Sequence, residues 1–255
     1  MPKKKEKKIV SRKKQDFYKA SVPAEKPSSS FYLEYNFLLK TIEAVNSFNH
    51  QYRTTRSGTK GGPSTHAQQD LYRAMLIFAC AGLDVFVKQL VKTKIPKLIV
   101  YDQIAHNKFK EFVKRGLKKD PNDILNTVAL ALIDRHPREV FLKDYIESMT
   151  SESLQSVNEL CRVSDASGLN TKEIFTLQKQ NQLKDAFHVR NQIIHEMDLN
   201  ISPDVSKTSR YRTRRERKSS IMEKHTKIIL DLAQELFLAY KTQFEDFKID
   251  VAKQS

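Results

Sequence analysis

Apolar residues return every three or four positions along four long stretches of the chain, the spacing that places side chains on one face of an α-helix. Pro96 is expected to end the second of these helices, because a proline lacks the N–H that continues the hydrogen-bond ladder. The region of about 98–180 divides into shorter helical pieces. The pattern predicts long helices over about 31–50, 65–94, 182–198 and 220–248.

Two short sequences predict helix starts inside the region of shorter pieces. Asp120-Pro121 combines a capping side chain with a proline at the first helical position. Asn170-Thr171 is followed by Glu173, which places an acid in the first turn. No stretch alternates as a strand does, and the chain has only six glycines. The expected fold class is therefore an all-α helical bundle.

The domain organisation expected from the sequence is simple. Residues 1–29 end in PAEKPSSS and offer little to bury, so they are predicted to be a disordered basic tail. Residues 30–250 are predicted to form one helical domain, with the shorter helices at about 98–180 inserted into it.

The formal net charge of +15 is concentrated in two short segments. Residues 1–14 hold eight Lys or Arg against one Glu, and residues 207–218 hold seven against one. Positive charge gathered on segments is typical of proteins that bind phosphate groups. A solvated tail and a nuclear localisation signal stay open as other interpretations of the first segment.

Several classes of protein are disfavoured by what the chain lacks. Cys80 and Cys161 form no CxxC pair, so a cytoplasmic protein without disulfides is expected. The longest apolar run, Met75 to Leu83, is shorter than the roughly 20 residues of a membrane span. No HExxH, carboxylate cluster, P-loop or GxGxxG occurs, so neither a metal nor another cofactor is expected.

The most unusual segment is Leu183 to Asp198, LKDAFHVRNQIIHEMD. Arg190 shares a helix face with apolar residues, where an unpaired guanidinium is costly. Beside that face, His188, Asn191 and His195 form a polar stripe with spacings of three and four. This composition is unusual for packing alone and indicates a candidate site. The apolar residues of the first face are Leu183, Phe187, Ile194 and Met197.

Asp84 is the only charged residue within 74–87, so it is expected to have a partner or a raised pKa. Arg190 is the natural partner, and we predict an ion pair in which Asp84 orients Arg190 with help from Asn191. The residues alone favour an ordinary buried ion pair that only fixes the register of two helices, because structural pairs outnumber catalytic ones.

The sequence RNQIIH, from Arg190 to His195, resembles the R-x4-6-H motif of the HEPN superfamily, including the Asn that often follows the Arg. The upstream stretch AGLDVFVKQLV is similar to the second helix of that fold, where an acidic residue commonly faces the motif. The order of the helices matches as well. Within the superfamily the chain resembles the RiboL-PSP-HEPN-like group over about residues 31–248.

The resemblance implies a HEPN-like bundle and a metal-independent endoribonuclease that acts as a homodimer. In such enzymes the ribose 2′-OH attacks the adjacent phosphate and leaves a 2′,3′-cyclic phosphate and a 5′-OH. His195 would be the general acid or base, Arg190 and Asn191 would bind the phosphate, and Asp84 would orient Arg190. His188 would be an accessory residue or a structural histidine.

The basic segment 206–218 directly follows the motif helix. Its arginines and its tyrosine could track an RNA backbone and stack a base, whereas a solvated loop between helices is the alternative. The candidate RNA-binding residues are Arg210, Tyr211, Arg212, Arg214, Arg215 and Arg217.

Three functions follow as hypotheses. The first is an RNA-cleaving toxin or antiphage defence effector, with an antitoxin or a larger defence complex as an expected partner. The second is a non-catalytic HEPN-like RNA-binding or sensor subunit, and the third is a helical interaction subunit whose basic tails grip nucleic acid. Growth arrest that depends on His195 would favour the first, and RNA binding without cleavage would favour the second.

Overall fold

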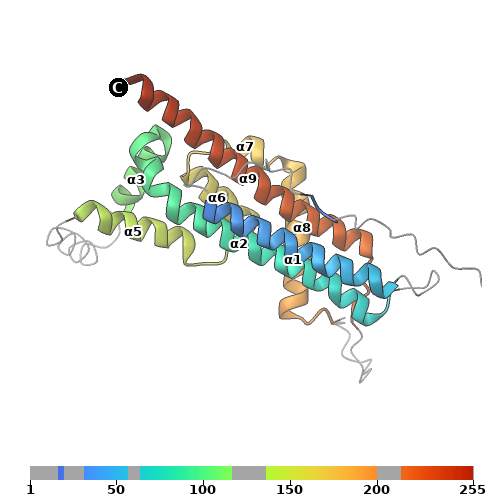
Figure 1. The fold of residues 1–255 in the computed structure, drawn as a ribbon. Coiled ribbons are helices and arrows are strands. Elements are labelled where there is room, and N and C mark those ends of the chain that lie inside the picture. Colours follow the sequence, from blue (N-terminus) through green and yellow to red (C-terminus); the bar gives the residue numbers. More distant parts are fainter. Residues whose placement is uncertain (1–16, 20–31, 57–63, 117–135, 200–213, 255) are drawn as a thin grey trace, which may run out of the picture.

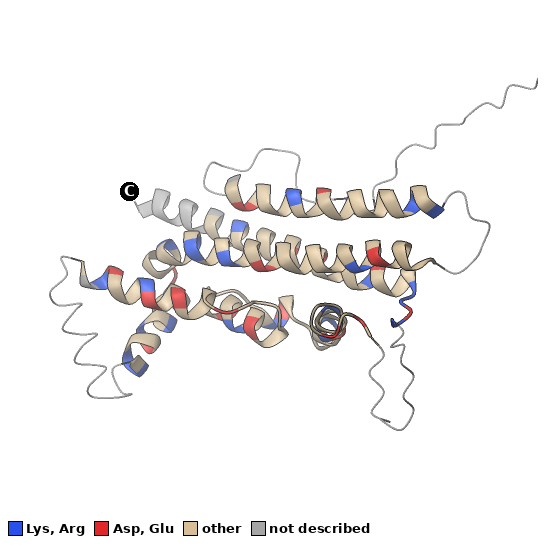
Figure 2. Ribbon diagram, turned by 90° about the horizontal axis from the view of Figure 1, so that it is seen from below, with Lys and Arg blue, Asp and Glu red and all other residues tan. Residues whose placement is uncertain are grey.

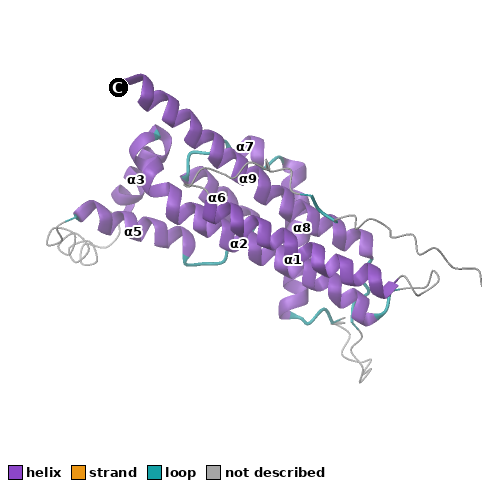
Figure 3. Cartoon of the chain, viewed as in Figure 1, coloured by secondary structure: helices purple, strands orange, loops and turns teal. Residues whose placement is uncertain are grey.

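Helices make up nearly all of the described chain (Figures 1 and 3). The computed structural model describes residues 17–19, 32–56, 64–116, 136–199 and 214–254. Within these ranges no strand occurs, apart from an isolated bridge between Leu199 and Arg214, so the predicted all-α class is confirmed. The described helices are α1 (Tyr32–Arg56), α2 (His66–Tyr101), α3 (Gln103–Gly116), α5 (Pro137–Thr150), α6 (Val157–Ala166), α7 (Thr171–Ile174), α8 (Leu177–His195) and α9 (Ser219–Gln254).

Helix α2 is the central element of the bundle. It packs against α1, α3, α5, α8 and α9. Its fully buried side chains include Leu76, Leu83 and Leu90, which are spaced by seven residues and therefore share one face. Figure 2 shows α8 nearly end-on while α1, α2 and α9 extend across the view, so α8 runs crosswise to the three long helices. Each turn of α8 therefore lies over a different part of its neighbours.

The predicted helix starts have different outcomes. Thr65 begins α2 with a capping box, in which its hydroxyl accepts from the Gln68 amide and the Gln68 side chain accepts from the Thr65 amide. Asn170 precedes the short helix α7 as expected, but its side chain donates to Glu173 and does not cap the backbone. Asp120-Pro121 lies outside the described residues.

The helix predicted to end at Pro96 continues through it to Tyr101, so that prediction is wrong. A proline inside a helix costs about 3 kcal/mol because it removes one hydrogen bond and crowds the preceding turn. Ile95, Leu98 and Ile99 are fully buried around it, and each such burial contributes about 1.5–3 kcal/mol. Tertiary packing therefore outweighs the local helix-breaking tendency.

Three residues of the predicted N-terminal tail are packed onto the bundle. Phe17 and Tyr18 are buried, and the Tyr18 backbone exchanges two hydrogen bonds of 2.9 Å with the Asn46 side chain on α1. The Tyr18 hydroxyl donates to Asp231 on α9 at 2.6 Å. Residues 17–19 thus depart from the expected disorder, because two aromatic rings supply apolar area that the rest of the tail lacks. Residues 1–16 and 20–31 lie outside the described residues.

Helix α2 is also the one described helix that is long and apolar enough to cross a membrane. Length and composition alone are weak evidence for a span, because the core helix of a bundle has the same properties. Half of the most apolar stretch of α2 is buried inside the bundle.

The side chain of Thr41 on α1 packs directly against Gly82 of α2. A Cβ atom there would lie 2.2 Å from the Thr41 hydroxyl oxygen. We expect Gly82→Ala to lower the free energy of unfolding by about 1–3 kcal/mol through overpacking, although alanine is the better helix former. Urea unfolding measures this change.

Gly116→Ala is the matched control, because nothing lies within 4 Å of the position that its Cβ would occupy. It is expected to leave the stability unchanged or to raise it by less than about 1 kcal/mol. Equal effects of the two substitutions would contradict the close packing of α1 on α2.

Candidate functional site

Helix α8 carries the candidate residues, and its inner face anchors them. The helix begins after Thr176, whose hydroxyl accepts from the Lys179 amide. Leu183, Ala186 and Phe187 are buried where α8 packs on α2 and α9. The helix starts five residues before the predicted start and ends at His195, three residues before the predicted end.

The predicted polar stripe is present and faces outward. His188, Asn191 and His195 are all exposed, so an imidazole, an amide and a second imidazole follow one another on the same side of α8. The second half of the apolar stripe is exposed as well. Ile194 is 39% and Met197 66% exposed, in contrast to the buried Leu183 and Phe187 of the same stripe. The last turn of α8 therefore extends beyond the core.

Arg190 lies half-buried beneath the polar stripe. Its Nη1 atom donates to the Asn191 Oδ1 atom at 2.9 Å, whereas its buried Nε atom has no hydrogen-bond partner among the described residues. Burial raises the pKa of the nearby Cys80 thiol on α2 to about 12, and the positive charge of Arg190 opposes this rise. Arg190 is thus a cation at the rim of the core, and some of its N–H groups make no hydrogen bond among the described residues.

The direction of the Arg190–Asn191 hydrogen bond decides what the stripe can bind. An arginine only donates, so the Asn191 Oδ1 atom is the acceptor and the Asn191 Nδ2 atom is left as an outward donor. A cation and free N–H groups on an exposed face are suited to an anion such as a phosphate.

The predicted ion pair between Asp84 and Arg190 does not form. Asp84 pairs with Lys88 one turn further along α2 at 3.0 Å, and it accepts from the Leu154 amide at 2.6 Å. Because α8 crosses α2 steeply, only a short part of α2 lies beneath Arg190, and this part contains Cys80. Asp84 lies one turn beyond it and fixes the residues that precede α6.

This correction gives a second prediction. Asp84→Ala is expected to lower the free energy of unfolding by about 1.5–3 kcal/mol, because it removes the carboxylate that accepts from the Leu154 amide and pairs with Lys88. Urea unfolding measures the change, with the exposed Asp144→Ala as control. Equal stability of Asp84→Ala and wild type would show that Asp84 does not fix the residues before α6.

The turn that follows His195 is held by a buried carboxylate that the sequence did not single out. Asp198 is 1% exposed, and its side chain accepts from Arg73 of α2 at 2.7 Å and from Arg217 at 2.5 Å. Met197 and Asp198 adopt positive φ angles of 51° and 56°, which non-glycine residues rarely do. The two arginines therefore stabilise an unfavourable turn directly after the motif helix.

Electrostatics agree with this geometry. Burial raises the pKa of Asp198, but the hydrogen bonds and charges of Arg217 and Arg73 outweigh it, so the pKa lies below its usual value. The carboxylate stays ionised at neutral pH.

Three arginines predicted to bind RNA are engaged in ion pairs within the chain. Arg214 pairs with Asp70 at 2.6 Å, Arg215 with Glu196 at 2.7 Å and Arg217 with Asp198. The acidic partners Asp70, Glu196 and Asp198 offset most of this positive charge. Asp70 lies far from the arginines in the sequence and is brought to them only by folding. Arg210, Tyr211 and Arg212, the other members of the predicted set, lie outside the described residues.

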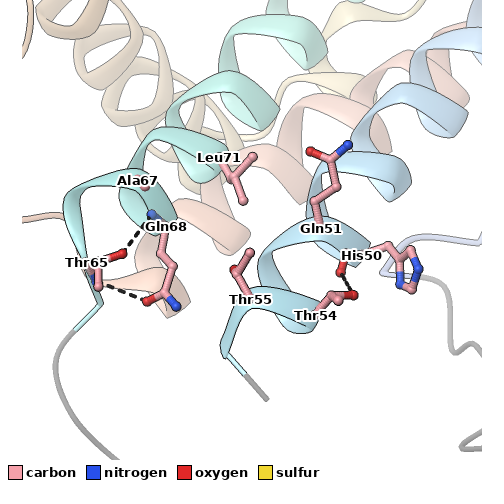
Figure 4. A pocket seen from close by; sticks show the side chains of 8 residues that line it. All are labelled: His50, Gln51, Thr54, Thr55, Thr65, Ala67, Gln68 and Leu71. Atoms are coloured by element: carbon pink, nitrogen blue, oxygen red, sulfur yellow. Dashed lines mark hydrogen bonds between the residues drawn. The ribbon is translucent and has the colours of Figure 1, made fainter. Parts of the chain in front are cut away.

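A cavity of about 750 Å³ opens at the end of the bundle where α1 ends and α2 begins (Figure 4). The side chains that line it include His50, Gln51 and Thr54 of α1 and Thr65 and Gln68 of α2. Two of its polar groups are already satisfied, since Thr54 donates to the His50 carbonyl and Thr65 takes part in the capping box. None of the motif residues lines this cavity, and His188, Asn191 and His195 lie on an exposed face of α8.

Metal-ligating residues are scattered over the described helices. Within the ranges that the structure describes, no three His, Cys, Asp or Glu side chains are grouped closely enough to hold an ion.

The helical fold, with the half-buried Arg190 and the exposed Asn191 and His195 on its crosswise helix, is that of a HEPN-type domain. The family model of RiboL-PSP-HEPN matches residues 34–246. The chain therefore belongs to the RiboL-PSP-HEPN family, which confirms the resemblance drawn from the RNQIIH motif. No curated protein and no solved structure gives a significant match to the chain.

Proposed function

We propose that the protein is a metal-independent endoribonuclease of the HEPN type. The observation that carries the proposal is the exposed stripe of α8, where Asn191 and His195 lie above the half-buried Arg190, which donates to the Asn191 side chain. HEPN domains are often ribonucleases, and this chain retains the arginine and the histidine of the family motif.

The chemistry assigned to these residues is an internal transesterification. The ribose 2′-oxygen forms a bond to phosphorus while the bond from phosphorus to the leaving 5′-oxygen breaks, which gives a 2′,3′-cyclic phosphate and a 5′-OH. One proton leaves the 2′-OH and one joins the 5′-oxygen. His195 transfers one of these protons, since imidazole titrates near neutral pH. Arg190 and the Asn191 Nδ2 atom donate to the phosphate oxygens and stabilise their growing charge.

A homodimer is part of the proposal. Ile194 and Met197 are exposed apolar residues on either side of His195. A second copy of the chain that covers them would remove apolar area from water and bring a second motif to the same cleft. The role of a cytoplasmic toxin or antiphage defence effector, restrained by an antitoxin or a larger complex, rests on the family resemblance.

Purified protein incubated with total RNA in EDTA tests the function. Wild type and the control variant His50→Ala, an exposed histidine of α1, are expected to cleave RNA, whereas His195→Ala is expected to leave it intact. Induced expression of wild type or of His50→Ala is expected to arrest cell growth, whereas expression of His195→Ala is not. RNA that is bound but not cut by wild type would contradict the proposal and favour the non-catalytic RNA-binding alternative.

A further inference from the structure

The side chain of Gln192 is held at both ends of its amide group. Arg217 donates from Nη2 to the Gln192 oxygen at 2.8 Å. The Gln192 Nε2 atom lies 3.0 Å from the Nε2 atom of His188, one turn earlier on α8. Gln192 therefore connects the residues that precede α9 to the polar stripe of α8.

The polarity of this chain of hydrogen bonds follows from its first member. Arg217 has donors only, so the oxygen of Gln192 is the acceptor and the amide nitrogen of Gln192 points toward His188. That nitrogen only donates, so the Nε2 atom of His188 accepts. A neutral imidazole carries one proton, and this network assigns it to the Nδ1 atom of His188.

Arg217 is itself fixed. Its Nε atom lies 3.1 Å and 3.2 Å from the two carboxylate oxygens of Asp198, which Arg73 of α2 holds from the other side. Gln192 and Arg217 therefore link the ring of the exposed His188 to a buried ion-pair cluster.

We propose that His188 binds a second phosphate of the RNA through its Nδ1–H group, with Gln192 as the residue that positions it. The inference rests on the proposed function, in that the ligand is RNA. His188 is exposed, and its Nδ1 atom has no partner among the described residues. His188 and His195 are seven residues apart, about 10.5 Å along the axis. Two side chains that project from one helix face at this separation reach different phosphates.

The stripe as a whole fits such a ligand. The His188 Nδ1 atom and the Asn191 Nδ2 atom are both outward donors, and arginines fix both of them, Arg217 through Gln192 and Arg190 directly. A row of donors along α8 matches the row of acceptor oxygens along an RNA backbone. This row of donors does not contact the bases. It therefore positions the RNA strand along α8 but does not select the sequence that is cut.

Nuclear magnetic resonance of the full chain labelled with ¹⁵N-histidine tests the proposal, with inorganic phosphate as the probe at pH 8. Wild type is expected to show His188 protonated at Nδ1, and phosphate is expected to shift that signal. Gln192→Leu removes the donor to His188. In this variant the Nδ1-protonated form of His188 is expected to be lost, together with the shift of its signal by phosphate. Gln178→Leu, an exposed glutamine in the first turn of α8, is the matched control and is expected to behave as wild type.

His188 protonated at Nε2 in wild type, or an equal phosphate response in Gln192→Leu, would overturn the proposal. These readouts need no turnover, so they are separate from the test of the nuclease. If wild type leaves RNA intact but His188 responds to phosphate as expected, the proposed catalysis fails and the phosphate contact stands.

Discussion

Arg73→Ala is expected to lower the free energy of unfolding by about 3–5 kcal/mol, the usual effect of removing one partner from a buried ion pair. The Arg73 side chain is 5% exposed and the Asp198 side chain 1% exposed, so the carboxylate cannot turn to water when Arg73 is lost and keeps Arg217 as its remaining partner. Arg73 also donates to the Arg215 carbonyl at 2.8 Å, which fixes the residues before α9. Urea unfolding followed by circular dichroism measures the change.

The same cluster makes the stability depend on pH. The folded-state pKa of Asp198 lies below its usual value, because the hydrogen bonds and charges of Arg217 and Arg73 outweigh the effect of burial. Its contribution is therefore complete above about pH 4, the ordinary carboxyl pKa, and is lost as the pH falls through the lower folded-state value. Arg73→Ala is expected to lose less stability on acidification than wild type, because the pKa of Asp198 is lowered less when Arg73 is absent.

Two variants separate the ion pair from other effects. Arg162→Ala removes an arginine from a more exposed pair with Glu159 and is expected to change the stability by no more than about 1 kcal/mol. Asp198→Asn keeps a side chain that tolerates the positive φ angle, so its effect reports the loss of the charge and of one acceptor oxygen and not backbone strain. A change of less than about 1 kcal/mol for Arg73→Ala would show that the cluster is not what holds the turn.

His195→Ala is expected to lower kcat for RNA cleavage by about 10²–10⁴-fold, the range for loss of a general acid or base. Arg190→Met is expected to lower it by about 10²–10³-fold, because the charge that builds on the phosphate loses its donors. Neither variant is expected to lower the melting temperature. His195 is exposed, and the buried Nε atom of Arg190 has no partner that the folded state would lose.

The Arg190 Nε atom, which has no partner among the described residues, makes the prediction for Arg190→Met specific. A buried donor without an acceptor costs about 1–3 kcal/mol, so methionine at this position is expected to leave the stability unchanged or to raise it. Single-turnover cleavage and thermal unfolding of the same preparations measure the two effects. A matched loss of stability and activity in Arg190→Met would instead indicate a structural arginine.

The helices that the sequence predicts correctly are those whose packing repeats along the chain. The four long helices follow from apolar residues at helical spacing, and their apolar faces are buried except at the end of α8, where Ile194 and Met197 are exposed. Pro96 does not end α2 as its missing N–H predicts, because the buried Ile95, Leu98 and Ile99 hold the helix together. Phe17 and Tyr18 were missed because two aromatic residues inside a basic segment give no periodic signal.

The candidate site was predicted only as far as one helix determines it. The outward stripe of His188, Asn191 and His195 follows from the geometry of α8 alone. The partner of Asp84 depends on how α8 crosses α2, and one sequence does not encode that angle in any visible pattern. The arginines before α9 looked free because their acidic partners Asp70 and Asp198 are brought to them only by folding.

The central claim is that the motif face of α8 cleaves RNA through the 2′-OH of the RNA itself. End-group analysis of an RNA oligonucleotide cut by wild-type protein in EDTA tests it most directly, alongside the same oligonucleotide with a 2′-deoxy sugar at the cut. The account predicts 2′,3′-cyclic phosphate and 5′-OH ends, and no cut at the deoxy position. Ends that carry a 5′-phosphate, or a cut that ignores the missing 2′-OH, would contradict it.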